Sequence, residues 1–409
     1  MVIFWIFAVI AMVGLAGYAG QVAAVIKTVR AGSKGTVAGT PPGQAPEEDF
    51  CPPISILKPL KGLDDNLFDN LESFCLQDYP AYEIIFSIQD HDDPVCRIVR
   101  KIRAKYPHRE ISILIEKCGD GLNPKVNNLI PAVRAARYEH VLISDSNVLV
   151  GRDYLRAVAS PMKDDRVGLV SSLIRGVRGR TLGSVFENLH LNSFIAGSVC
   201  LLDRFLHMPC VIGKSMLMRK GDLEEIGGMQ AVKDFLAEDY IIGKRMHDSG
   251  RRVVLSNYAI SNVNEYWGLK KFINRHTRWG KLRWKIGGVK YLSELAGNAV
   301  FISFLPLLLS GFSAMTASLA IGVSAVKMAG DYYLGRRLDT GMNPLLYLFV
   351  PVKDIVIGCI WFVPLLSSSV VWRGNRYVIG DNSLLAPYPE SGLWTLSTRV
   401  FNALRTREA

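Results

Sequence analysis

Four polar clusters rich in carboxylates and arginines follow one another along the 409-residue chain. They are Asp90-His91-Asp92-Asp93, Asp145-Ser146-Asn147, Glu238-Asp239 and Arg275-His276-Thr277-Arg278-Trp279, the last lying just before a long apolar tail. Carboxylates can hold a metal ion and a nucleotide-sugar and can deprotonate an acceptor alcohol, whereas paired arginines can neutralise a departing diphosphate. The four clusters together, and none alone, predict a membrane-bound sugar transferase.

The second cluster is the candidate metal site. Asp145 ends an apolar run at 140–144, where a carboxylate is costly unless it is paired or faces a site. Asn147 departs from the common Asp-x-Asp pattern, because it removes one negative charge but keeps an oxygen ligand suited to Mg²⁺ or Mn²⁺. We therefore predict Asp145 and Asn147 as ligands of a divalent cation.

The first cluster has a functional and a purely structural interpretation. Asp93 precedes Pro94, so it fits an N-cap with proline at the first helical position as well as it fits a ligand. Asp90 fits an ordinary turn at the end of a strand. Glu238 and Asp239 open a predicted helix that runs to Ser249, where acids commonly complement the helix dipole.

Two further groups are candidate anion-binding residues. Lys125, Asn127 and Asn128 begin a predicted helix, where amides and a cation can meet phosphate or ribose, although a solvated helix start explains them equally well. Arg275 and Arg278 have helical spacing and can clamp a diphosphate. Lysines from 270 to 290 surround them, so the same segment is also predicted to lie at a membrane surface.

The stretch between residues 53 and 147 alternates short apolar runs with segments of helical period. This pattern predicts an α/β fold with a parallel sheet wrapped by helices. Strands are predicted at 54–57, 83–89, 111–115 and 140–144. Ligands gather outside the carboxyl ends of such strands, so Asp90, Asp93 and Asp145 are expected to converge.

The composition indicates an integral membrane protein. Hydrophobic residues make up 49 % of the chain and concentrate at its two ends. Residues 2–26 carry no charge, and Lys27, Arg30 and Lys34 follow them, which predicts an anchor and a cytoplasmic active domain. The net charge of +11 is densest beside aromatic and apolar residues, so the expected partner is an anionic membrane surface and no nucleic acid.

The C-terminal region contains two apolar zones. Residues 295–326 carry no charge, and Pro306 and Gly311 predict a break into a hairpin, while Lys353-Asp354 interrupt the second zone at 340–371. Either each zone crosses once or the first is re-entrant. The seven cysteines contain no CxxC pair, which favours reduced thiols. The predicted organisation is an anchor at 1–28, a linker at 29–50, a catalytic domain at 51–265, an amphipathic segment at 266–294, a membrane region at 295–380 and a tail at 381–409.

These motifs, in this order, resemble those of ceramide glucosyltransferases, which are inverting membrane enzymes with a GT-A nucleotide-sugar-binding fold. The resemblance rests on Gln89-Asp-His-Asp-Asp-Pro94, Asn123-Pro-Lys-Val-Asn-Asn128, Ser144-Asp-Ser146, Ala237-Glu-Asp-Tyr240 and Arg275-x-x-Arg278-Trp279, and it extends through Leu57-Lys-Pro-Leu-Lys-Gly62, Ser215-Met-Leu-Met-Arg-Lys220 and Trp372-Arg-Gly-Asn-Arg-Tyr377.

The resemblance implies a role for each cluster. Asp239 corresponds to the catalytic base, and Asp145 serves the metal and the diphosphate. The remaining expected UDP-sugar-binding residues are Asp90, Asp93, Lys125, Asn128, Glu238, Arg275, Arg278 and Trp279. The implied reaction transfers glucose from UDP-glucose to the primary hydroxyl of ceramide, at the inner membrane of a bacterium or the Golgi membrane of a eukaryote.

Two alternatives remain open from the sequence. A hopanoid-lipid N-acetylglucosaminyltransferase shares the clusters but uses UDP-GlcNAc and a polyol lipid. A non-catalytic membrane protein that binds nucleotide-sugar or lipid is the second, and Asn147 is its main support. Assays that pair each donor with each lipid distinguish the three.

Overall fold

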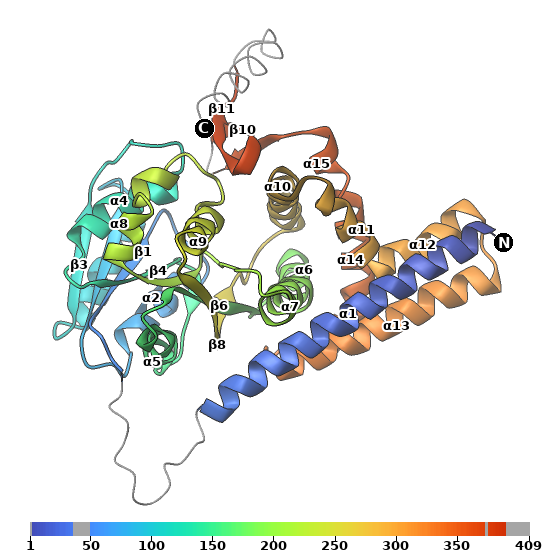
Figure 1. Ribbon diagram of the computed structural model, residues 1–409, viewed down its shortest axis with the longest axis horizontal. Helices are drawn as coiled ribbons and strands as arrows, with labels where there is room; N and C mark the ends of the chain where they lie inside the picture. Colours follow the sequence, from blue (N-terminus) through green and yellow to red (C-terminus); the bar gives the residue numbers. More distant parts are fainter. Residues whose placement is uncertain (1, 36–49, 373–374, 390–409) are drawn as a thin grey trace, which may run out of the picture.

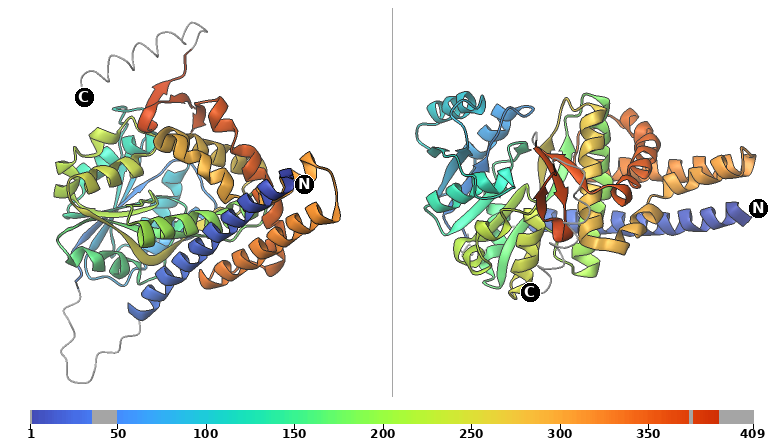
Figure 2. Two further views of the ribbon diagram at one scale, coloured as in Figure 1. Left: turned by 45° about the vertical axis from the view of Figure 1, so that its right-hand side comes forward. Right: turned by 90° about the horizontal axis from the view of Figure 1, so that it is seen from above.

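A computed structural model describes residues 2–35, 50–372 and 375–389. The predicted tail beyond residue 389 and most of the predicted linker lie outside these residues. An α/β domain lies at one end of the molecule, and helices α1 (Val2–Gly35), α12 (Ala299–Leu309) and α13 (Ala314–Arg337) run side by side away from it (Figures 1 and 2). The two predicted apolar ends of the chain therefore meet in one bundle.

The central sheet has eight strands in the order β3-β2-β1-β4-β7-β6-β8-β5. Its strands are β1 (Ile54–Pro59), β2 (Tyr82–Ile88), β3 (Glu110–Ile115), β4 (His140–Ser144), β5 (Val148–Leu149), β6 (Val167–Val177), β7 (Ser215–Arg219) and β8 (Arg252–Val263). The first four strands are parallel, as predicted. The second half is mixed, because β7 runs antiparallel to both β4 and β6.

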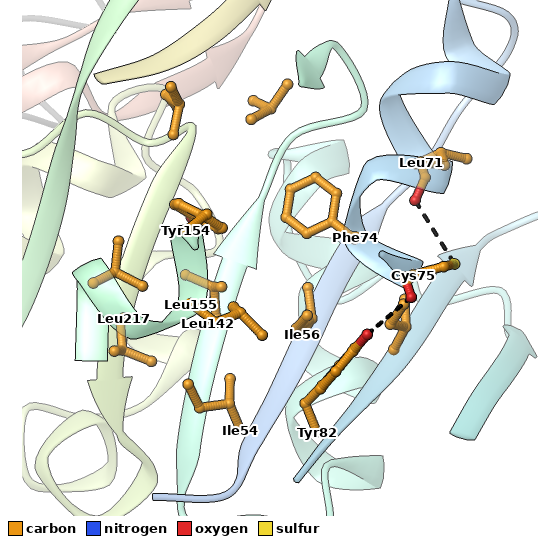
Figure 3. Packing of buried hydrophobic residues seen from close by; sticks show 14 of the residues in the cluster. Ile54, Ile56, Leu71, Phe74, Cys75, Tyr82, Leu142, Tyr154, Leu155 and Leu217 are labelled. Atoms are coloured by element: carbon orange, nitrogen blue, oxygen red, sulfur yellow. Dashed lines mark hydrogen bonds between the residues drawn. The ribbon is translucent and has the colours of Figure 1, made fainter. Parts of the chain in front are cut away.

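Helices cover the sheet and supply its core. They are α2 (Leu67–Cys75), α3 (Val95–Lys105), α4 (Pro124–Ala135), α5 (Tyr154–Ala159), α6 (Leu182–His190), the π-helical turn η2 (Leu191–Ile195), α7 (Ala196–Leu206), α8 (Lys220–Glu225) and α9 (Glu238–Asp248). In Figure 3, Phe74 of α2 and Tyr154 of α5 pack with Ile56 and Leu142 of the sheet. Burial of these side chains stabilises the strands whose ends carry the polar clusters.

The membrane-side helices continue the chain after β8. They are α10 (Leu269–Gly287), α11 (Ser293–Gly297), α14 (Val350–Ile360) and α15 (Val363–Leu366), followed by the small antiparallel sheet of β9 (Ser369–Trp372), β10 (Asn375–Ile379) and β11 (Leu385–Pro387). The 3₁₀ turns are η1 (Ser160–Lys163), η3 (Met229–Val232), η4 (Gly288–Leu292), η5 (Pro344–Phe349) and η6 (Asp381–Ser383).

Three helical segments of the described residues are long and apolar enough to cross a bilayer, namely 2–30, 182–206 and 344–366. A fourth candidate is the bent pair formed by 269–297 and 299–309. Large apolar side chains on α1, among them Trp5, Val9 and Val13, are exposed, as expected for a surface that faces lipid.

Most of the predicted architecture agrees with the structure. The α/β domain with apolar helices at both ends is confirmed. The predicted hairpin is present as α12 and α13, whose connecting residues include Gly311 in a left-handed conformation. All seven cysteines are free. The antiparallel β7 and the candidate span at 182–206 were not predicted from the sequence.

Candidate active site

The active-site edge of the sheet is set by the pairing of β4 with β7. Ser144 at the end of β4 lies opposite Ser215 at the start of β7, because the two strands are antiparallel. Asp145 and Lys214 therefore leave the sheet at the same edge, and Lys214 Nζ lies 3.2 Å from Asp145 Oδ2. Lys58 of β1 also holds this edge in place, because its buried ammonium group donates to the Asp145 carbonyl oxygen at 2.8 Å.

Lys125, in the first turn of α4, joins three parts of the site. Its Nζ lies 3.0 Å from Asp145 Oδ1, 3.0 Å from Glu238 Oε1 and 2.8 Å from the Gly213 carbonyl oxygen. Asn123 caps α4 by accepting from the backbone N–H of Lys125, and its side-chain amide donates to Glu238 Oε2 at 3.0 Å. Glu238 thus contacts Lys125 and Asn123, and it positions Lys125 beside Asp145.

Asp239, at the start of α9, has the environment of a general base. Its Oδ2 accepts from the Gly213 N–H and its Oδ1 from the Tyr240 N–H, each at 2.8 Å. Burial and the negative charge of Glu238 raise the pKa of Asp239 to about 6, against the opposing effect of Lys125 and the two amides. A carboxylate with this pKa is ionised at neutral pH and remains basic enough to take a proton from an alcohol in the transition state.

The predicted metal ligands Asp145 and Asn147 are close together, and Lys214 lies between them. Lys214 Nζ donates to Asn147 Oδ1 at 2.5 Å in addition to its contact with Asp145. Burial alone would raise the pKa of Asp145, but Lys125 and Lys214 outweigh it and hold that pKa well below its usual range. Within residues 2–35, 50–372 and 375–389, no group of three His, Cys, Asp or Glu side chains is arranged to hold a metal ion.

The first acidic cluster follows β2 and lies along the same cavity. Both Asp93 carboxylate oxygens accept from the Gly62 N–H, at 3.0 and 2.9 Å, and Oδ1 also accepts from the Val95 N–H at 2.9 Å. Asp93 therefore does cap the start of α3, as its structural interpretation predicts, and it also holds the loop after β1. Asp90 Oδ1 accepts from the Asp92 N–H at 3.0 Å, which is the predicted turn contact.

The two asparagines of α4 differ in their surroundings. Asn127 is occupied by the backbone of Gly121, to which it donates and from which it accepts. Asn128 donates to the Leu60 carbonyl oxygen at 3.0 Å, whereas its own Oδ1 is buried and has no hydrogen-bond partner among the described residues. Of the two, only Asn128 lines the cavity.

The arginine cluster lies on α10, which forms the opposite wall. The Arg275 guanidinium lies over the Trp279 ring, 4.3 Å from its centroid, and over the Trp267 ring at 5.0 Å. Its Nη1 lies 3.2 Å from Oε1 of Glu187, a fully buried residue of α6 whose Oε2 contacts His276 Nε2 at 2.8 Å. These contacts fix the direction in which Arg275 points.

A single cavity of about 1190 Å³ brings the predicted site together. Its lining includes all eleven predicted residues, namely Asp90, Asp93, Lys125, Asn128, Asp145, Asn147, Glu238, Asp239, Arg275, Arg278 and Trp279. Acids, cations and a base from β2, β4, α4, α9 and α10 thus face one space large enough for a nucleotide-sugar.

One wall of this cavity is apolar. It is formed by Ile174 of β6, Ile212 before β7, and Ile195 and Val199 of the η2–α7 segment. Helix α7 packs directly against α1, so this wall adjoins the membrane bundle (Figure 1). The cavity therefore offers polar groups for a charged ligand and an apolar side next to the helix that packs against α1.

The sequence profile of glycosyl transferase family 21 matches residues 7–385, which include every residue of this cavity. The chain belongs to this family.

Curated relatives of this glycosyltransferase include two proteins from Caenorhabditis elegans. Ceramide glucosyltransferase 1 is 30 % identical over 336 residues, which cover 80 % of this chain and 71 % of the relative. Ceramide glucosyltransferase 3 is 27 % identical over 350 residues, which cover 83 % and 76 %. Among solved structures, a mannosyltransferase from Pyrobaculum calidifontis in complex with GDP-Man and Mn²⁺ matches 88 % of this chain and 98 % of its own, at 17 % identity and a TM-score of 0.49.

Several residues of this family 21 site were not predicted from the sequence, among them three near Asp145 and Asp239. Lys214 and Gly213 lie in the loop before β7, and Lys58 is buried within β1. A lone lysine in a loop carries no spacing signal, and its role follows only from the pairing of β7 with β4. A lysine inside an otherwise apolar strand is a signal that was available, because a buried ammonium group requires acceptors.

Proposed function

We propose that this family 21 glycosyltransferase transfers glucose from UDP-glucose to the primary hydroxyl of ceramide with inversion at the anomeric carbon. The observation that carries the proposal is the convergence of Asp145, Asp239 and Arg275 on one cavity with an apolar wall beside the membrane bundle. The names of the relatives support ceramide as the acceptor. A polar donor and a lipid alcohol can enter such a cavity from different sides.

The reaction is one displacement. The acceptor oxygen forms a bond to the anomeric carbon while the bond from that carbon to the UDP oxygen breaks, which inverts the configuration and gives a β-glucoside. Asp239 takes the proton of the acceptor hydroxyl, since each of its oxygens accepts only one backbone N–H in the structure and keeps a lone pair. Arg275, Arg278 and Lys125 stabilise the charge that develops on UDP.

The remaining predicted residues contribute to binding of the sugar donor. Asn128 lines the cavity and its Oδ1 has no hydrogen-bond partner among the described residues, and Trp279 orients Arg275 by stacking. Asp90 and Asp93 shape the loop edge near the nucleotide, while Glu238 holds Lys125. Lys27 and Arg30, at the end of the apolar span 2–30 within α1, support a cytoplasmic orientation of the α/β domain.

A divalent cation, Mg²⁺ or Mn²⁺, is the cofactor that the sequence predicts at Asp145 and Asn147. The oxygens of these two residues do converge on one cation position, but the Lys214 ammonium group lies on it. A divalent ion fits there only when Lys214 withdraws. Removal of the acceptor proton and stabilisation of the UDP charge are therefore assigned to side chains of the protein.

Purified full-length protein in detergent provides the test. UDP-glucose and UDP-GlcNAc are each offered with ceramide and with a hopanoid polyol, and the lipid product is identified by mass spectrometry and its anomeric configuration by NMR. We expect β-glucosylceramide. A product formed only from UDP-GlcNAc and the polyol would overturn the substrate assignment, an α-linked product would overturn inversion, and UDP-glucose binding without any product would favour a non-catalytic protein.

Asp239→Asn tests the base in the same assay. The variant is expected to bind UDP-glucose normally and to lose turnover by about 10²-fold or more. Asp248→Asn is the matched control, because Asp248 lies exposed at the other end of α9 and contacts Lys244. Near-normal turnover of Asp239→Asn would show that another group takes the proton.

A further inference from the structure

Lys214 occupies the point between the two oxygens that the sequence assigns to a metal. Its Nζ lies 3.2 Å from Asp145 Oδ2 and 2.5 Å from Asn147 Oδ1, and the Lys214 side chain is only 11 % exposed. The antiparallel pairing of Ser144 with Ser215 fixes the backbone at both sides of this contact. The ammonium group is therefore held by the fold of the sheet edge itself.

The amide of Asn147 is oriented toward this lysine by two other asparagines. Asn147 Nδ2 donates to Asn264 Oδ1 at 2.9 Å and to Asn262 Oδ1 at 3.2 Å, so the carbonyl oxygen of the same side chain faces Lys214. Asn147 thus presents a neutral carbonyl oxygen to the Lys214 ammonium group.

The charges at Asp145 also match a site that needs no divalent ion. Lys125 contacts Oδ1 of this carboxylate at 3.0 Å, and Glu238 at the same distance, while Lys214 contacts Oδ2, so two positive charges face Asp145. This is the charge that a single Mg²⁺ or Mn²⁺ ion would bring. Both lysines and Arg275 line the cavity, so cationic groups from two sides of it are available to an anion.

We propose that Lys214 supplies the cation for the donor diphosphate, so that donor binding and transfer proceed without a divalent metal ion. The inference rests on the proposed function and names how its diphosphate is recognised. Lys214 keeps its contacts with Asp145 and Asn147 and donates its remaining N–H to a phosphate oxygen, opposite the arginines of α10. Lys125 completes the pair.

The first test needs no variant and no acceptor. The affinity of the full-length protein for UDP is measured by calorimetry in excess EDTA and again with millimolar Mn²⁺. The two dissociation constants are expected to agree within about twofold. A Kd at least about tenfold lower with Mn²⁺ would overturn the inference, and because this assay involves no transfer, its result is independent of whether ceramide is the acceptor.

The second test compares Lys214→Met with Lys244→Met by UDP affinity and by turnover, with EDTA or with Mn²⁺. Lys244 is half exposed and pairs with Asp248 away from the cavity, so its variant is the matched control and should behave as the unmodified protein. Lys214→Met is expected to lose about 100-fold in turnover in EDTA and to recover with Mn²⁺, since the vacated oxygens can then bind the ion.

Each outcome separates the two proposals. Loss of turnover by the unmodified protein in EDTA with recovery on Mn²⁺, or unchanged turnover of Lys214→Met in EDTA, would contradict a lysine in place of the metal. If the unmodified protein binds UDP but transfers no glucose under any condition, the proposed function fails, and the UDP affinities still decide the role of Lys214. A poorly folded Lys214→Met variant leaves the metal-free UDP affinity of the unmodified protein as the deciding measurement.

Discussion

The Gly213 N–H donates to Asp239 Oδ2 at 2.8 Å, and a Cβ atom on Gly213 would lie 2.6 Å from that same oxygen. The loop that carries Lys214 therefore also positions the proposed base. Gly213→Ala must displace the carboxylate or the loop. A displacement of about 1 Å at a reacting group can cost about 100-fold in turnover, and we expect a loss of about 10- to 100-fold for this variant.

Turnover and thermal stability of Gly213→Ala, measured together, separate a local effect from unfolding. Gly322→Ala on the exposed surface of α13 is the control, because a Cβ there meets nothing within 4 Å. Full turnover of Gly213→Ala would mean that the base does not depend on this hydrogen bond.

The pKa of Asp239, raised to about 6 by burial and by Glu238, predicts the pH dependence of transfer. The base acts when ionised, so kcat/KM should fall tenfold per pH unit below about pH 6. Glu238→Gln removes a neighbouring negative charge and should lower the pKa of Asp239, which moves this acid limb to lower pH. An acid limb that stays in place or moves upward would exclude Asp239 as the titrating group. The exposed Glu225→Gln serves as the control.

The sequence predicts those parts of the site that depend on local pattern. Apolar runs and helical periods locate β1 to β4 and α2 to α4, so the convergence of Asp90, Asp93 and Asp145 could be expected from a parallel sheet. The contact of Asp145 with Lys214 could not be expected in this way. It depends on β7, which follows α6 and α7 in the chain and pairs antiparallel with β4. Non-local strand pairing leaves no period in the sequence.

The partners of buried charged side chains were also hard to predict from the sequence. The pattern Asp93-Pro94 fits both a cap and a ligand, and the carboxylate of Asp93 accepts from the Val95 N–H at the start of α3 and from the Gly62 N–H of the loop after β1. Glu187 gave no motif at all, although it contacts Arg275 and His276 from the buried side of α6. Partners of this kind become visible only when the helices are placed against each other.

Glu187→Gln is expected to weaken donor binding and to destabilise the protein. The carboxylate is fully buried between Arg275 and His276, and an amide would leave the arginine charge without its counter-ion. Breaking a buried pair costs about 3 to 5 kcal/mol, and release of Arg275 should raise the KM for the donor about tenfold. Glu110→Gln removes a comparable but exposed contact to Arg137 and should change stability by less than about 1 kcal/mol. Equal effects of the two variants on thermal unfolding and KM would argue against this role.

The close packing of α1 against the C-terminal helices is testable at two glycines of one helix. A Cβ on Gly14 would lie 2.6 Å from the Ala296 carbonyl oxygen and 3.2 Å from Ala299 Cβ, whereas a Cβ on Gly17 would meet nothing within 4 Å. Small residues allow apolar helices to approach closely, so Gly14→Leu should force α1 away from α11 and α12 at a cost of about 1 to 3 kcal/mol. Gly17→Leu adds the same side chain to the exposed surface of the helix and should leave the unfolding temperature in detergent unchanged.

Since the apolar wall of the cavity reaches α1 through α7, the displaced helix in Gly14→Leu should also raise the KM for the lipid acceptor while leaving UDP affinity intact. Equal unfolding temperatures for the two variants would show that α1 does not depend on this contact.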